Sequence, residues 1–177
     1  HPEELVQQAY ELGYEAIALT DECSYSGLVK AHKTAKACGI KLICGAEFVL
    51  DEAPLLADTD ALGNRCRLIL LAPNRQAYGQ ISSLISKLRK RSDKGTYYLT
   101  RHDLQVGLSK CLGIWICEGQ GVEQLSAVGA HLQSLIPRLW IGLGLFHDGQ
   151  DLHKTACALT LSSALKLPIV AVNDVHT

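Results

Sequence analysis

Short apolar runs alternate with amphipathic segments along the whole chain, and this alternation constrains the fold more than any other feature. The runs have the length and composition of buried strands, and they lie at 16–19, 41–50, 67–72, 112–117, 138–145 and 168–172. Helical spacing of apolar residues predicts helices near 2–12, 27–38, 75–90, 122–135 and 151–165. Strand-then-helix order predicts a mostly parallel sheet covered by helices, in a doubly wound or a barrel arrangement.

The ends of the predicted helices carry recognisable signals. Pro2 occupies a first helical position, and Gly13 and Gly39 follow the last residues of the first two helices. Thr100 and Asp103 have the spacing of a capping box and predict a short helix between them. The segment 51–64 contains a proline and several acidic residues, and we interpret it as an excursion or a hairpin connection.

Composition excludes several classes of protein. The 177 residues are 47% apolar and 20% charged, which is ordinary for one globular domain and excludes disorder. No apolar run approaches the roughly 20 residues that a membrane span needs, so we expect no membrane partner. The net charge of -1 gives no global electrostatic argument for nucleic acid. The seven cysteines form no CxxC pair, and we expect reduced thiols in a cytoplasmic protein.

Acidic and imidazole side chains recur where the predicted strands end. Asp21 and Glu22 follow the first strand, Glu47 lies in the second, His147 follows the fifth, and Asp174 and His176 follow the last. Oxygen and nitrogen ligands that converge from several strands suit a divalent metal. The simpler interpretations are that Asp21 caps a turn and that His176 is a surface residue. Glu47 resists such an interpretation, because a buried carboxylate needs a partner.

A basic run ends the helix predicted near 75–90. Its cations are Lys87, Arg89, Lys90, Arg91 and Lys94. The ordinary interpretation is a solvated helix end whose positive charge favours the helix dipole. The sharper hypothesis is a local contact with DNA phosphate. The chain has no GxSxG, P-loop or HExxH motif, and Gly142 and Gly144 are interpreted as strand glycines beside a crowded site.

Two regions of the sequence carry a resemblance to a known family. The segment Gly13–Asp21, with Gly27 and the segment Ala35–Glu47, resembles the PHP domain of bacterial C-family DNA polymerases. The likeness continues through 68–72 and Tyr78 to the final Asn173–His176. Within the family, Thr20–Cys23 and Cys44–Phe48 are most similar to the error-prone, damage-tolerance type.

The resemblance implies a distorted (β/α)7 barrel with a multinuclear metal site at its mouth, here lacking its first strand and that strand's His-x-His pair. We therefore expect residues 1–177 to form a single PHP-type domain, a fragment of a longer polymerase chain. The family's remaining ligand positions fall on Asp21, Glu22, Glu47, Arg67, His147 and His176, with Asp174 adjacent. Glu22 and Arg67 depart from the pattern, since histidine is usual at both.

Arginine at a metal position is the decisive departure, because a guanidinium cannot donate a lone pair. Arg67 could pair with Glu47 or with Asp21 in place of a metal, and we predict that it forms a buried ion pair with Glu47. At most one divalent metal, Zn, Mn or Mg, would then remain.

The function implied is a structural and interaction module supporting DNA synthesis across damage. The parent would be a DNA-directed DNA polymerase acting in replication and repair. Its partners would be the polymerase body, template-primer DNA, a sliding clamp and damage-tolerance accessory proteins. The alternative is a metal-dependent phosphoesterase of the same family, acting as a 3′–5′ exonuclease, a pyrophosphatase or a small phosphatase.

Overall fold

The computed structural model describes residues 1–50, 66–105, 107–117, 121–146 and 149–173. These residues form six strands and six helices. In chain order they are α1 (Pro2–Glu11), β1 (Ala16–Leu19), α2 (Leu28–Cys38), β2 (Lys41–Leu50), β3 (Cys66–Leu71), α3 (Arg75–Arg91), α4 (Arg101–Leu104), β4 (Leu112–Cys117), α5 (Val122–Leu135), β5 (Arg138–Leu143), α6 (Asp151–Leu165) and β6 (Ile169–Ala171). The predicted connection 51–64 and the predicted ligands His147, Asp174 and His176 lie outside the described residues.

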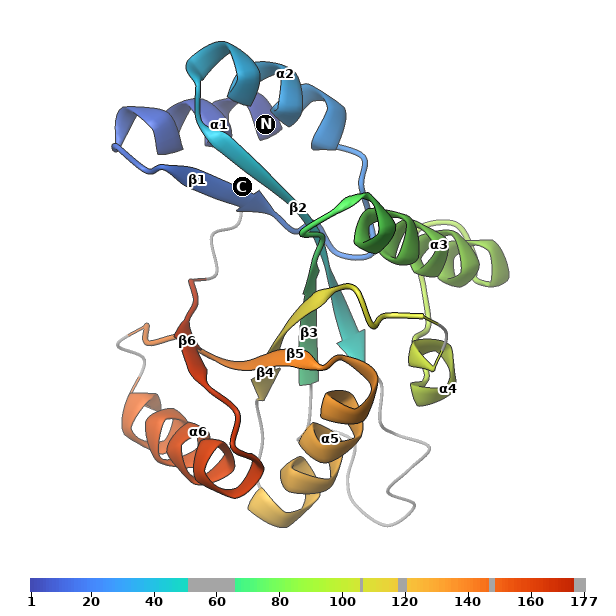
Figure 1. The fold of residues 1–177 in the computed structure, drawn as a ribbon, viewed down its shortest axis with the longest axis vertical. Coiled ribbons are helices and arrows are strands. Elements are labelled where there is room, and N and C mark those ends of the chain that lie inside the picture. The colour runs from blue at the N-terminus through green and yellow to red at the C-terminus, as the bar shows by residue number, and fades with distance from the viewer. Residues whose placement is uncertain (51–65, 106, 118–120, 147–148, 174–177) are drawn as a thin grey trace.

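The strands form one curled sheet in the order β1-β2-β3-β4-β5-β6 (Figure 1). A sheet whose strands lie side by side in the same order as in the chain is typical of a barrel, whereas the strand order of a doubly wound sheet changes direction partway. The sheet therefore corresponds to part of a barrel wall. The doubly wound alternative is therefore wrong. The (β/α) barrel class is confirmed, and the described wall is a half-barrel.

The expectation of a mostly parallel sheet needs one correction. β3 is antiparallel to both of its neighbours, whereas β1–β2, β4–β5 and β5–β6 are parallel pairs. The sequence pattern alone does not show the direction of β3, because a strand of either direction has the same apolar character. The reversal places the beginning of β3 beside the end of β2.

The register divides the sheet into two unlike faces. Phe48 lies opposite Leu68, and Leu68 lies opposite Trp115; all three side chains are fully buried on the face that the helices cover. On the other face, Val49 lies opposite Arg67 and Glu47 lies opposite Ile69. Glu47 and Arg67, two residues of opposite charge, thus lie on the face that the larger helices leave uncovered.

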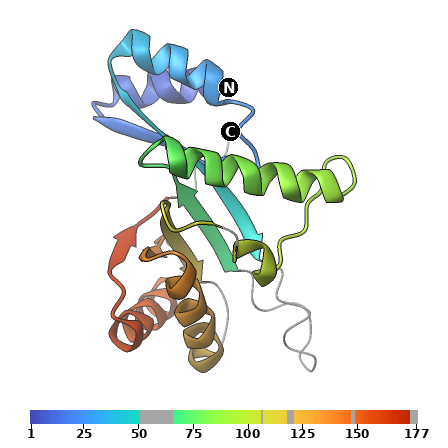
Figure 2. The same ribbon diagram turned by 45° about the vertical axis from the view of Figure 1, so that its right-hand side comes forward.

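The helices cover the outside of the sheet in three groups. α1 and α2 pack together beside β1 and β2, around Val6 and Ala31 (Figure 1). α3 lies over β2 and β3, and α5 and α6 lie side by side near β5 (Figure 2). Gly39 caps the end of α2, and its φ of +81° is costly for other residues. No helix within these ranges combines the length and hydropathy needed to cross a bilayer.

Candidate metal centre

Glu47 and Arg67 meet on the uncovered face of the sheet. Glu47 stands near the end of β2 and Arg67 at the beginning of β3, and the antiparallel pairing brings them together. The Arg67 Nη1 and Glu47 Oε1 atoms are 3.5 Å apart, and the side chains are 16% and 18% exposed. The predicted ion pair therefore forms and is largely shielded from water.

The segment Asp21–Cys23 continues the sheet past the end of β1. The Glu47 amide donates to the Asp21 carbonyl at 3.2 Å, and the Cys23 amide donates to the Glu47 carbonyl at 2.8 Å. Glu22 and Glu47 are thus paired through their backbones in parallel. The sheet places Asp21, Glu22 and Glu47 at one end of the described wall, as the sequence predicts.

The Glu22 carboxylate is engaged by a residue that the sequence did not single out. The Tyr97 hydroxyl donates to Glu22 Oε1 at 2.7 Å and accepts the Val49 amide at 2.8 Å. Burial raises the pKa of Tyr97, and the Glu22 carboxylate raises it further, against the opposing effect of the Val49 hydrogen bond. The phenol therefore keeps its proton and stays a donor to Glu22 at neutral pH.

Arg89 fixes the acidic segment from the other side. Its Nε and Nη2 atoms donate to the carbonyls of Cys23 and Glu22, each at 3.1 Å. Nη1 donates to the Thr96 carbonyl at 3.1 Å, and the guanidinium lies 5.3 Å from the centre of the Tyr97 ring. Cys23 has a φ of +45°, a strained conformation for a residue with a side chain. Arg89 thus holds a strained turn that sets where Glu22 points.

A shallow pocket adjoins Arg67 where β4, β5 and β6 end. Its wall includes Arg67, Lys154 of α6 and Asn173. A Cβ added at Gly144 would meet the Phe146 ring at 2.8 Å, and one added at Gly142 would meet Ile114 and Ile116 at 2.9 Å. The glycines therefore permit close packing beside the site, as predicted, although Gly144 lies one residue past the end of β5 rather than within the strand.

The described donors do not fit a metal cluster. Across the described ranges, no group of three His, Cys, Asp or Glu side chains is placed to hold a metal ion. Glu47 faces a guanidinium and Glu22 accepts from a phenol, so both carboxylates have partners that are not metals. Burial raises the pKa of the Cys117 thiol to about 12, which leaves this thiol protonated at neutral pH.

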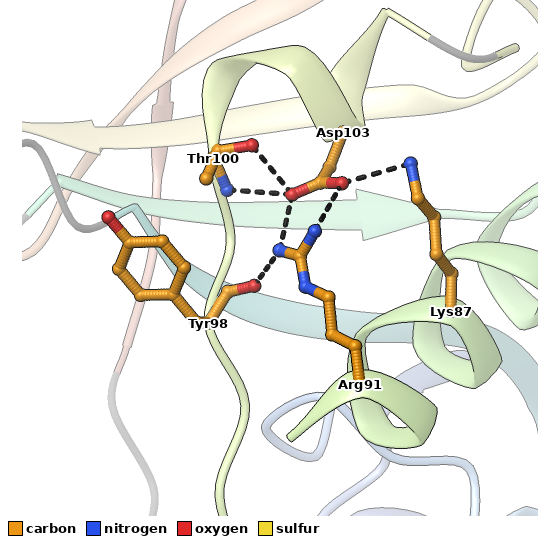
Figure 3. A network of polar contacts seen from close by, with 5 residues as sticks. All are labelled: Lys87, Arg91, Tyr98, Thr100 and Asp103. Carbon is orange, nitrogen blue, oxygen red and sulfur yellow. Dashed lines mark hydrogen bonds and ion pairs between the residues drawn. The ribbon is translucent and has the colours of Figure 1, made fainter.

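The basic run is largely occupied within the chain. Arg91 and Lys87 both bind the Asp103 carboxylate, at 2.5 Å and 2.9 Å (Figure 3). The Thr100 amide and hydroxyl also donate to Asp103, at 2.9 Å and 2.7 Å, which completes the predicted capping box. In the described part of the chain, Lys90 and Lys94 are exposed and make no hydrogen bond or ion pair. The hypothesis of DNA contact through this run remains a prediction.

The family model for the PHP domain matches residues 1–158, and the chain belongs to this family. The chain is 43% identical over 178 residues to an error-prone DNA polymerase of Methylococcus capsulatus, covering 99% of this chain. It is 42% identical over 171 residues to the error-prone DNA polymerase of Teredinibacter turnerae, covering 97% of this chain. The chain spans only 16% and 15% of the length of these two relatives.

Solved structures support the fold. An amidohydrolase from Chromobacterium violaceum, with bound SO4 and no metal, superposes with a TM-score of 0.69 at 14% identity, over 99% of this chain and 82% of that one. A "putative metal-dependent phosphoesterase" from Bifidobacterium adolescentis gives a TM-score of 0.62 at 15% identity, over 96% and 80%. At such low identity these likenesses show the fold alone.

Proposed function

We propose that this chain is the PHP domain at the N-terminus of an error-prone DNA polymerase III alpha-like subunit, and that it serves there as a structural module. Residues 1–177 would form this domain within a cytoplasmic polymerase that copies damaged template-primer DNA. Clamp and damage-tolerance proteins would be partners of that parent chain. The relatives at 42–43% identity support the placement.

The observation that carries the structural role is the Arg67–Glu47 contact. In a metal centre, cations hold the converging carboxylates together. Here the guanidinium supplies positive charge from within the chain, 3.5 Å from Glu47. A guanidinium stays protonated at any physiological pH and offers no lone pair. Tyr97 supports the same conclusion, because it offers Glu22 a hydroxyl donor.

Residual metal binding at a reduced site is part of the proposal. Asp21 and Glu22 are exposed carboxylates, and His147, Asp174 and His176 are the remaining expected ligands. Oxygen and nitrogen donors of this kind would hold at most one Zn, Mn or Mg ion. The phosphoesterase alternative draws on the fold, which this chain shares with a protein named for that activity.

A pair of measurements tests the structural role. A chelator should leave the melting temperature of the purified chain unchanged, since Arg67 rather than a metal neutralises Glu47. Phosphoesterase activity with added Zn, Mn or Mg should stay at the background of an Asp21→Asn, Glu47→Gln variant. A chelator-induced drop in melting temperature, together with metal-dependent hydrolysis above that background, would support the phosphoesterase instead.

Arg67→His is the sharper variant, because it replaces a cation with a metal donor of the kind usual in the family. We expect this change to strengthen zinc or manganese binding relative to wild type. Arg67→Gln is the matched control, since it removes the same charge without adding an imidazole. Equal metal binding by the two variants would mean that position 67 is no longer connected to a metal site.

A further inference from the structure

The outer side of α5 and α6 carries almost no charge. The two helices lie side by side at one end of the molecule (Figure 1). Residues 124–135 of α5 and 155–165 of α6 contain no Asp, Glu, Lys or Arg. By contrast, α2 exposes Lys30, Lys33 and Lys36. A solvated helix face normally carries such charges.

α6 is apolar on two opposite sides. Ala158 and Leu161 are buried against the rest of the protein. The opposite stripe, at helical spacing, consists of Leu152, Ala156, Leu159 and Ser163, all exposed. Leu152 is 89% exposed and Leu159 is 58% exposed. A second leucine stripe on the side opposite the buried one is typical of a helix that packs against partners on both sides.

The neighbouring surface of α5 continues this pattern. Ala127, Ala130 and Ser134 are exposed there, so the two helices together present small and apolar side chains. Charge is depleted from the centres of protein interfaces, and these small side chains leave Leu152 and Leu159 as the large apolar residues of the face. We propose that this outer face of α5 and α6 is the surface on which the polymerase body, the remainder of the same polypeptide, docks. The inference rests on the proposed function.

The size of the surface favours a tethered partner over a second copy. α6 has 15 residues, which makes it about 22 Å long. With α5 of 14 residues beside it and each helix about 10 Å across, the face measures about 22 Å by 20 Å, or roughly 440 Å². This area falls short of the roughly 800 Å² per partner of a standard stable interface between separate chains. A covalently linked partner needs less area, because the linkage raises its effective concentration. The relatives supply such a partner, since this chain spans only 16% of their length.

Photo-cross-linking in the full-length polymerase tests the proposal. A benzoylphenylalanine replaces Leu152 or Leu159, and the control carries it at Val29 of α2, which is 68% exposed beside Lys30. We expect the α6 probes to join peptides of the same polypeptide outside residues 1–177, and the Val29 probe to stay largely unreacted. Unreacted α6 probes would overturn the proposal. So would cross-links between heavy- and light-isotope copies, which would identify a second copy as the occupant.

A charged variant gives an independent readout. Leu152→Glu with Leu159→Glu should speed proteolytic release of the domain from the full-length chain by roughly tenfold or more, because burying two leucines is then lost. Val29→Glu should leave the release rate unchanged, and equal rates in the two variants would overturn the proposal. If the full-length chain lacks DNA polymerase activity, the proposed function itself fails. If it polymerises DNA while the α6 probes stay unreacted, only the docking inference fails.

Discussion

The α3 side and the α5–α6 side of the molecule differ in how many charged side chains they carry and in what those side chains contact. α3 carries Lys87, Arg89 and Arg91, and each of these side chains binds an acceptor from another part of the chain. α5 and α6 are of similar length but almost free of charge, with leucines facing outward. These three cations of the α3 side are therefore satisfied within this chain, whereas the α5–α6 side exposes leucines on which a partner can pack.

This difference predicts where substitutions destabilise the domain itself. On the α3 side and around Glu47 and Arg67, removing one polar group leaves its partner shielded from water and without a hydrogen bond or ion pair. On the outer face of α6, Leu152 is 89% exposed, so a substitution there removes little contact within the domain and acts mainly through a docked partner.

Asp103→Asn should cost the most, about 3 kcal/mol of unfolding free energy, because a 1% exposed carboxylate then loses its charge-assisted hydrogen bonds. Chemical denaturation of the variant and of Asp93→Asn, an exposed control, measures the difference. The control should change stability by less than about 0.5 kcal/mol. Equal costs in the two variants would mean that the network in Figure 3 contributes nothing.

The same carboxyl group predicts a dependence on pH. Burial by itself would raise the pKa of Asp103, but hydrogen bonds from Arg91, Thr100 and Lys87 outweigh it and hold the pKa well below its ordinary value of 3.8. The depressed pKa contributes stability that is present above pH 3.8 and is lost as the pH falls toward the folded-state pKa. Asp103→Asn should therefore lose less stability than wild type on acidification below about pH 4.

Arg67→Ala should cost about 2 kcal/mol, because it leaves the Glu47 carboxylate shielded and without its guanidinium. In a separate comparison, the double variant Arg67→Met, Glu47→Gln should lose less stability than the sum of the losses in Arg67→Met alone and Glu47→Gln alone. A double-mutant cycle measures this coupling. Strict additivity would show that the 3.5 Å contact carries no energy.

Tyr97→Phe should cost about 1 kcal/mol, because the Val49 amide and the Glu22 carboxylate both lose the hydroxyl. Tyr98→Phe is the matched control, since the Tyr98 ring is 40% exposed. Equal melting temperatures for the two variants would exclude a structural role for the Tyr97 hydroxyl.

Lys90 and Lys94 should contribute little to stability and more to binding of DNA, if the basic run contacts phosphate. Replacing both with Gln in the full-length polymerase should flatten the log-log salt dependence of DNA binding by roughly 0.7–0.9 per contact. Lys87→Gln should lower stability instead, since Lys87 binds Asp103. An unchanged slope in the double variant would mean that these lysines do not contact DNA and belong to a solvated helix end.

Local patterns predicted the elements well. The strand Leu112–Cys117 and the helix Asp151–Leu165 have the predicted bounds, because apolar period and flanking turn residues define them locally. The reversal of β3 was not predictable in this way, since strand direction depends on connections rather than on composition. The Arg67–Glu47 contact followed from the family resemblance.

The supporting residues of the site could not be found from the sequence. Tyr97 lies 75 positions from Glu22, and Arg89 lies 66 positions from Cys23. Each would pass for an ordinary residue of a loop or of a basic helix end. Only the packing of α3 and the following segment against the end of β2 brings them to the acidic turn.

Metal content distinguishes a salt-bridged site from a metal centre most directly, because Arg67 supplies a cation from within the chain beside Glu47. The purified wild-type chain, equilibrated with zinc, manganese and magnesium and then desalted, is measured by elemental analysis. We expect at most about one weakly held divalent ion per chain. Two or three ions that survive desalting would contradict this expectation, because Arg67 would then stand beside a working metal centre rather than in place of one.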